Sequence, residues 1–362
     1  MNQYRFEDAP EAIIGTSIWG FEDADRPQRL QKFFDQCTHE RFLLSGKDLV
    51  APNSAYDIAS SIRGIKSNPS ITKADLCETT AINAAVLDST MQLMLMTTCK
   101  TDGISLGSSN TFKWRNNETA AGFLDRVYAR VPAGPAYEQL VNVRNLRAYA
   151  LTRYAGVKIR ATEKLSDHLY LIYGDDYKTL LVFSHRSFLE YGLERLENDR
   201  DDLNHSTTEA LTLGCLNPGL IVETLKTLDV LFPSIGDKRS REILKKWVAE
   251  NNLDGRLLDN PTIFSNNQPP KDLQGLYEQY PYWGRHLARL LREADDPTPV
   301  TWWQKYTERG RSPRRMFECA MAALLVTAIS AFIATALAAV QVWIAYCDWE
   351  SAPSRSWCPS KS

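Results

Sequence analysis

The sequence predicts a mainly α-helical protein of the α+β type, in which a soluble helical body with a minor β-hairpin or sheet is followed by one transmembrane helix. Three observations support this prediction. Apolar residues recur every three or four positions in most segments, as on one face of a helix. Only a few short runs resemble strands. Residues 319–342 form an uninterrupted apolar stretch, which is long enough to cross a bilayer.

The apolar stretch, CAMAALLVTAISAFIATALAAVQV, contains no charged residue and one side-chain amide, Gln341. As a helix it would be about 36 Å long, against ~30 Å for the hydrocarbon core of a bilayer. The alternative is a buried helix of a soluble protein. Basic residues precede the stretch, acidic residues follow it and aromatic residues flank both ends, which favours a span with its N-terminal side in the cytosol. The predicted membrane-interface residues are Trp302, Trp303, Tyr306, Arg309, Arg311, Arg314, Arg315, Trp343, Tyr346 and Trp349.

Small side chains recur every four residues along the apolar stretch. Such a face lets two helix backbones approach closely, so we expect it to pair with a second copy or with another membrane helix. The alternative is an alanine-rich helix that only passes through lipid. The residues of the candidate pairing face are Ala323, Thr327, Ala331, Thr335 and Ala339.

We therefore predict four segments. Residues 1–300 form a cytosolic, mainly helical body with a hairpin near 157–184, residues 301–315 an amphipathic, basic juxtamembrane segment, residues 316–346 the transmembrane helix and residues 347–362 a short exoplasmic tail. The first residues are acidic and lack the apolar core of a signal peptide. We therefore expect a single-pass, tail-anchored protein in an endomembrane or the plasma membrane. Cys347 and Cys358 in the tail are candidates for a disulfide, for palmitoylation or for free thiols.

Helical periodicity and capping signals locate most elements of the body. Thr72 with Asp75, and Asn217 with Pro218, are typical of helix starts. The predicted helices cover residues 26–37, a segment from Ser54, residues 73–98, residues 135–154, a segment from Pro218, and residues 238–250 and 280–294. Strands are predicted at 157–162 and on both sides of Gly174, with a weaker hairpin at 103–114.

The segment LYLIYGDDYKTLLVF, residues 169–183, places Gly174, Asp175 and Asp176 between two apolar arms. The Tyr-Gly-Asp-Asp tetrad resembles the metal-binding motif of RNA-dependent polymerases. Those enzymes also need a metal-binding Asp on an upstream strand and a basic template channel, whereas residues 1–308 carry a net charge of −5. Gly and Asp are common in hairpin turns. We therefore interpret the tetrad as a turn.

Two other patterns are weak candidates for catalysis. Ser105 lies in GISLG, which matches the G-x-S-x-G of α/β-hydrolases, but the residues that follow are poor helix formers and do not suit a nucleophile elbow. His168 and His185 flank the two arms of the predicted hairpin and could meet at its open end. No third ligand is placed by spacing, so a histidine with a structural hydrogen bond is the simpler interpretation.

Charge and cysteine spacing narrow the classes of function. The acidic balance of residues 1–308 gives no reason to expect a nucleic acid partner. None of the seven cysteines forms a CxxC pair, so their spacing indicates neither a zinc site nor a redox pair. We predict no cofactor and no metal.

Several stretches resemble an uncharacterised family of filamentous-fungal proteins with a C-terminal single-pass transmembrane helix. The similar segments are SDHLYL at 166–171, FSHRSFLEYGL at 183–193, LDVLFP at 228–233, YPYWGRHLARL at 280–290 and DPTPVTWWQ at 296–304. The resemblance implies a fungal origin and a C-terminal anchor, and it brings no activity, cofactor or site residues.

Taken together, these patterns predict a membrane-anchored protein of unknown molecular activity. We expect a scaffold or accessory factor that contacts the lipid bilayer, a cytosolic protein partner and, through its transmembrane helix, a homo- or hetero-oligomeric partner. The alternative is a membrane-tethered enzyme of hydrolase type that uses Ser105.

Overall fold

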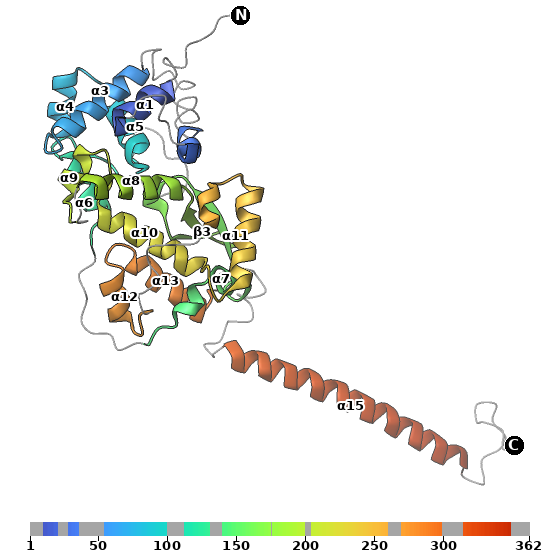
Figure 1. Cartoon of the computed structure of the whole chain (residues 1–362). Coiled ribbons are helices and arrows are strands. Elements are labelled where there is room, and N and C mark those ends of the chain that lie inside the picture. The colour runs from blue at the N-terminus through green and yellow to red at the C-terminus, as the bar shows by residue number, and fades with distance from the viewer. Residues whose placement is uncertain are drawn as a thin grey trace, which may run out of the picture. The chain divides into compact units, whose positions relative to one another are not determined.

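The computed structural model describes residues 10–20, 28–35, 54–99, 112–130, 140–174, 176–199, 204–259, 269–298 and 314–348. The chain divides into two compact units, residues 1–300 and 301–362. The first unit, called the body below, contains all described elements except the long helix α15, Arg314–Asp348 (Figure 1). The predicted class, mainly α with a small sheet and one C-terminal apolar helix, is confirmed.

The N-terminal part of the body is a group of helices that pack on one another (Figure 1). Helix α3 packs against α1, α4 and α5. The Lys66 ammonium of α3 lies 3.2 Å from the carbonyl oxygen of Ser17 and thereby neutralises the end of α1. The elements are α1 Pro10–Trp19, η3 Gln28–Leu30 with helix continuing to residue 35, α3 Ser54–Ser67, α4 Lys73–Thr80 and α5 Ala84–Leu95.

The single helix predicted at 73–98 is wrong, because the chain breaks between α4 and α5. Ala81 ends α4 in the left-handed conformation with φ 54°, and the Asn83 side chain accepts a hydrogen bond from the Ala85 N–H to cap α5. Thr72 caps α4 as expected and accepts from the Asp75 N–H. The apolar periodicity runs through the break, so it alone does not reveal a local turn.

A mixed three-stranded sheet follows, in the order β1-β3-β2. Strand β1, Val157–Thr162, is parallel to the central strand β3, Lys178–Phe183, and β2, Tyr170–Tyr173, is antiparallel to it. In register, Val157 lies opposite Lys178 and Tyr170 opposite Leu181. The short helical turn η5, Leu165–Asp167, connects β1 to β2. The strands predicted at 157–162 and around Gly174 are confirmed.

The Gly-Asp-Asp segment lies at the turn between β2 and β3, as predicted. The Gly174 N–H donates to the Tyr177 carbonyl oxygen at 3.0 Å and closes the hairpin. A Cβ on residue 174 would lie 3.0 Å from that same oxygen, so the turn favours glycine there. Asp175 lies outside the described residues.

The remaining helices complete the body, with α10 against α8 and α11 against α7 (Figure 1). Asn217 and Pro218 start α10, and α11 covers residues 238–250, both as predicted. The elements are α6 Ala120–Val127, η4 Val143–Leu146, α7 Ala148–Arg153, α8 Arg186–Asp199, α9 Thr207–Thr212, α10 Pro218–Leu231, α11 Lys238–Glu250, η6 Gly255–Leu258, α12 Leu273–Gln279 and α13 Gly284–Asp295.

Two predicted helices differ from the structure in their described residues, because their caps come from distant residues. In the described residues 140–154, η4 and α7 replace the helix expected at 135–154, whose predicted start at Pro135 lies outside the described residues. The α7 N-terminus is capped by Ser240, whose Oγ accepts from the Tyr149 N–H at 3.0 Å. The helix expected at 280–294 begins at Gly284, after Glu223 has accepted the Tyr282 and Trp283 N–H groups at 2.9 and 2.5 Å.

The core of the body is one continuous apolar cluster that contains two buried ion pairs. Lys73 Nζ lies 2.5 Å from Asp88 Oδ1, and Lys178 Nζ lies 2.5 Å from Glu293 Oε1. Glu293 also accepts from the Tyr173 hydroxyl at 2.8 Å and from the Thr298 N–H at 2.7 Å. These bonds join the sheet, α13 and the end of the body.

Candidate functional site

Helix α15 is apolar, and its residues 320–346 are exposed. The 29-residue segment Ala320–Asp348 contains an 18-residue window with a mean hydropathy of 2.3, and none of that window is buried. Phe332 is 77 % exposed and Leu325 59 %. Among the described residues it is the one helix long and apolar enough to cross a membrane.

The hydroxyl groups of α15 are satisfied inside the helix itself. Thr327 donates to the Ala323 carbonyl oxygen at 3.0 Å, and Thr335 donates to that of Ala331 at 2.8 Å. Such internal bonds remove the cost of placing a hydroxyl in hydrocarbon. The candidate pairing face of Ala323, Thr327, Ala331, Thr335 and Ala339 is exposed on this unit, and its pairing stays a prediction.

Parts of the predicted membrane interface lie in the described part of the chain. Trp343 and Tyr346, near the C-terminal end of α15, are 45 % and 49 % exposed. Arg314 and Arg315 are the first two residues of the helix. Cys347 is disulfide-bonded, and Cys358 lies outside the described residues. The other predicted interface residues, Trp302, Trp303, Tyr306, Arg309, Arg311 and Trp349, also lie outside them.

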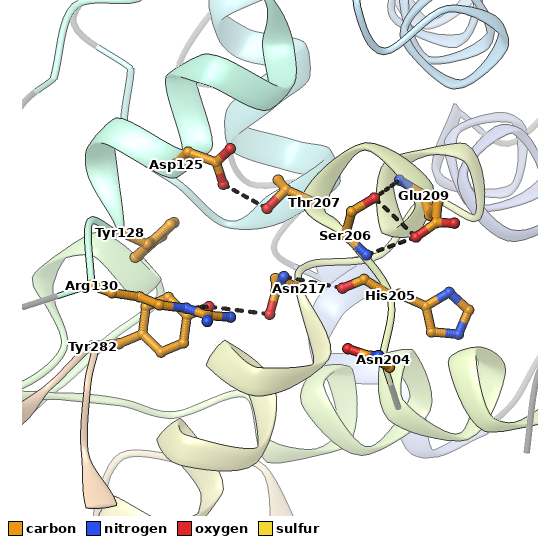
Figure 2. A pocket seen from close by; sticks show the side chains of 10 residues that line it. All are labelled: Asp125, Tyr128, Arg130, Asn204, His205, Ser206, Thr207, Glu209, Asn217 and Tyr282. Atoms are coloured by element: carbon orange, nitrogen blue, oxygen red, sulfur yellow. Dashed lines mark hydrogen bonds between the residues drawn. The ribbon is translucent and has the colours of Figure 1, made fainter. Parts of the chain in front are cut away.

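In the body, a polar cleft of about 540 Å³ opens between three segments that are distant in the sequence and is also lined by Asn217, the N-cap of α10. The segments are the end of α6, the start of α9 with the loop before it, and the turn before α13 (Figure 2). The lining residues are Asp125, Tyr128, Arg130, Asn204, His205, Ser206, Thr207, Glu209, Asn217 and Tyr282.

One wall of the cleft is a chain of hydrogen bonds through Tyr282 (Figure 2). Arg130 Nε donates to the Tyr282 hydroxyl at 2.9 Å, and that hydroxyl donates to Asn217 Oδ1 at 3.2 Å. The Arg130 guanidinium carbon also lies 5.2 Å from the centre of the Tyr282 ring. The remaining N–H groups of the exposed Arg130 therefore provide a positioned cationic donor at the mouth.

The opposite wall carries hydroxyl and carboxylate groups whose roles are mainly structural. Ser206 and Glu209 form a capping box at the start of α9, with the Glu209 N–H on Ser206 Oγ at 3.2 Å. Thr207 donates to Asp125 Oδ1 at 2.6 Å and joins α9 to α6. Because Ser206 Oγ also donates to Glu209, it is committed to the cap, which does not suit a nucleophile.

Histidine 205 contributes its backbone to the cleft. Its carbonyl oxygen accepts from Asn217 Nδ2 at 3.3 Å, and its Nε2–H donates to the Leu196 carbonyl oxygen at 3.3 Å. The ring lies away from Arg130 and Tyr282 (Figure 2). Within the described part of the chain, its buried Nδ1 has no hydrogen-bond partner. His205 therefore makes no Ser-His pair with Ser206.

Behind the cleft, Glu223 holds the turn that carries Tyr282. Its carboxylate accepts the N–H groups of Tyr282 and Trp283, and only 3 % of the residue is exposed. Burial raises the pKa of Glu223 to about 7, although the two backbone donors favour its charged form. The position of the Tyr282 ring therefore depends on a titratable group inside the protein.

The histidines predicted as catalytic candidates are structural in their contacts. His168 is fully buried, with Nδ1 accepting from the Phe183 N–H at 3.1 Å. Its Nε2 must then carry the proton and donate to Thr227 Oγ1 at 2.7 Å. His185 is 6 % exposed, with its ring 5.7 Å from that of Phe183. Burial lowers the pKa of His168 to about 3 and of His185 to about 4.

The other predicted site residue, Ser105, lies outside the described residues. Among the residues that are described, no group of three His, Cys, Asp or Glu side chains could hold a metal ion. The cleft was not predicted, because its walls come from α6, α9, the start of α10 and the turn before α13. The local signals were present, since Asn217 was expected to cap α10, but no sequence pattern brings Asn217 to Tyr282.

Comparison of the chain with models of protein families, with curated proteins and with solved structures finds no match.

Proposed function

We propose that this chain is a membrane-anchored protein whose helical body binds a cytosolic partner, as a scaffold or accessory factor. The observation that carries the proposal is the exposed apolar segment Ala320–Asp348. An exposed apolar helix of this length is costly in water and stable in a bilayer. The proposal includes a single crossing with the basic residues Arg309, Arg311, Arg314 and Arg315 on the cytosolic side.

The polar cleft supports the partner-binding part of the proposal. It offers the cationic donor Arg130 and the phenol of Tyr282 on a rigid frame of hydrogen bonds. These groups suit a polar partner segment with a carboxylate or carbonyl acceptor. The runner-up is a tethered hydrolase that uses Ser105, which Ser105→Ala tests directly. The hydrolase alternative is supported if the Ser105→Ala protein folds normally but loses a cellular function that the Arg130→Ala protein keeps.

The anchor is tested with the full chain carrying a tag at each end. We expect the protein to stay in the membrane pellet after alkaline carbonate extraction. Protease should remove the N-terminal tag at once and the C-terminal tag only after detergent is added. Release by carbonate together with digestion of both tags would refute the anchor.

A matched pair of double variants controls this experiment. Ile329→Asp with Phe332→Asp puts two charges into the middle of the span, at a cost of roughly 5–7 kcal/mol of insertion. We expect that variant in the soluble fraction or in aggregates. Ile329→Leu with Phe332→Leu keeps the span apolar and should behave like the original protein.

The partner-binding part is tested by proximity labelling from the N-terminal tag. Neighbours captured by the original protein should be lost in Arg130→Ala combined with Tyr282→Phe. They should be kept in Arg63→Ala, an exposed arginine of α3. Equal capture by all three proteins would show that the cleft does not bind the partner.

A further inference from the structure

Two segments of the body are strongly basic although the chain as a whole has a net charge of −2. Residues 144–164 carry six Arg or Lys against Glu163, and residues 238–249 carry five against Glu242. An average over the whole body hides this separation of charge. The surface potential depends on where the charges lie in space, so the arrangement of the two segments decides what they can bind.

The structure brings the two segments together at α7 and α11. The Tyr149 N–H of α7 donates to Ser240 Oγ of α11 at 3.0 Å. Arg239 Nη1 donates to the Tyr149 hydroxyl at 3.0 Å, and the guanidinium carbon lies 4.8 Å from the centre of that ring. The ring of Tyr154 meets that of Tyr149 at 6.1 Å. These contacts join the side chains of Arg239, Tyr149 and Tyr154 into one continuous group.

The edge strand β1 extends this surface after a turn at Gly156. Lys158 and Arg160 alternate with Val157, Ile159 and Ala161, so the two cations share one face of the strand. Both are exposed. The Lys158 ammonium lies 4.1 Å from the centre of the Tyr177 ring, which holds the amine at the surface.

The cations of this surface lack carboxylate partners. Within the described residues, no ion pair involves Arg153, Lys158, Arg160 or Arg239. Elsewhere in the body, Arg126 pairs with Glu118 at 2.7 Å and Arg186 pairs with Glu190 at 2.7 Å. The nearby Arg147 lies 3.8 Å from Asp237, so part of its charge is compensated.

Two large apolar side chains project from the same region. Tyr154 is 68 % exposed and Ile235 is 86 % exposed. Ile235 lies in the turn before α11, where Gly236 takes a φ of +83°. It lies two residues before Asp237, whose carboxylate lies 3.8 Å from the guanidinium of Arg147 at the start of α7. An exposed Ile beside unpaired cations is typical of a surface that inserts shallowly into lipid.

We propose that this surface, formed by Arg153, Tyr154, Lys158, Arg160, Ile235 and Arg239, binds an anionic lipid bilayer. The cations suit lipid phosphates and carboxylates, and Tyr154 and Ile235 suit the boundary between headgroups and acyl chains. Nucleic acid would match the charge but would leave Ile235 in water, and an acidic protein is distinguished from lipid by the experiment below. The proposal rests on the proposed anchor, which would keep a bilayer close to the body at all times and make weak contacts sufficient.

The test is hydrogen–deuterium exchange on the full chain in nanodiscs of phosphatidylcholine alone and of phosphatidylcholine with phosphatidylserine. We expect residues 148–162 and 234–242 to be protected only in the discs that contain phosphatidylserine. The protection should weaken in 0.5 M salt, because screening shortens the reach of the charges. Equal exchange in the two kinds of disc would overturn the proposal.

Two triple variants of equal charge make the test specific. Arg153→Glu with Lys158→Glu and Arg160→Glu should weaken association with the charged bilayer on the order of a hundredfold or more and abolish the protection. Arg63→Glu with Arg115→Glu and Arg285→Glu changes three exposed arginines elsewhere and should keep it. Loss in both variants would show a net-charge effect only and would refute the surface.

The same samples test the anchor separately, through co-purification of the chain with the discs. If the chain does not co-purify with discs of either composition, the anchor is refuted. The surface is then tested by adding phosphatidylserine discs to the unanchored full chain, with the same expected protection. Protection of these residues by an acidic polypeptide but not by the charged discs would assign the surface to an acidic protein and overturn the lipid proposal.

Discussion

The two units of the chain place the same side chains in opposite surroundings. In the body, Ile62, Leu290 and Phe123 are completely buried. In α15, Leu325 is 59 % and Phe332 is 77 % exposed. Polar groups differ as well. In the body, the buried charges of Lys178 and Glu293 form an ion pair. In α15, the hydroxyls of Thr327 and Thr335 donate hydrogen bonds to carbonyl oxygens of the same helix. The difference is the one expected if, as proposed, the body lies in water and α15 in lipid.

The largest effect on stability is expected when a buried charge of the body loses its partner. Glu293→Ala removes the partner of Lys178 and the acceptor for Tyr173 and Thr298. We expect a loss of about 4 kcal/mol in the free energy of unfolding, because a lone buried ammonium is left. Urea unfolding measures it. Gln341→Ala in α15 is the control and should leave the unfolding of the body unchanged.

The next largest effect is expected from a Leu→Ala substitution, which can be compared between the two units. Leu290→Ala in α13 opens a cavity in the core and should cost about 3 kcal/mol of stability. Leu325→Ala removes an exposed side chain of α15, so the midpoint of body unfolding should not move if α15 lies in a bilayer as proposed. A Leu325→Ala protein destabilised as much as Leu290→Ala would show that α15 packs as part of a soluble core.

Acid should weaken the body through its buried histidines. Burial lowers the pKa to about 3 for His168 and to about 4 for His185 and His286. Since an unfolded histidine titrates near 6.5, the unfolded chain binds more protons below that pH. Burial raises the pKa of Glu223 to about 7 and of Asp229 to about 6, which opposes the effect. We expect a net loss of about 2 kcal/mol between pH 6.5 and 5, measured by urea unfolding.

Glu223→Gln separates the opposing contribution. Below pH 7 the folded protein retains a proton on Glu223 that the unfolded chain releases, so this group stabilises the body as the pH falls. Glutamine keeps an acceptor for the Trp283 N–H but does not titrate. The loss between pH 6.5 and 5 should therefore become larger by about 1.5 kcal/mol in the variant. An unchanged slope would mean that Glu223 does not titrate in this range.

Sequence patterns predicted the elements whose signals are local. Thr72 and Asn217 cap their own helices, and the apolar arms around Gly174 pair through a short turn. The apolar stretch that forms α15 is also a local property. Elements with distant partners were missed or misplaced. Helix α13 begins where Glu223 accepts its first N–H groups, and α7 begins where Ser240 does.

The candidate sites follow the same division. The candidate membrane segment was visible in the sequence because length and composition define it. The cleft and the basic surface were not, since Tyr282 lies 65 positions from Asn217 and Arg239 lies 90 positions from Tyr149. The net charge, which gave no reason to expect a nucleic acid partner, averages over groups that the fold separates.

The distant caps have a consequence for how the body assembles. Helices α7 and α8 receive caps from Ser240 and Asp254, the latter through the Ser187 N–H at 2.6 Å. A polypeptide that ended after α8 would lack both groups, so those two short helices would be marginal in it. Two fragments divided between α8 and α9 should therefore be poorly helical apart and regain helicity when mixed. Circular dichroism would follow the recovery. Folding of the first half would then have to wait for the second half to leave the ribosome.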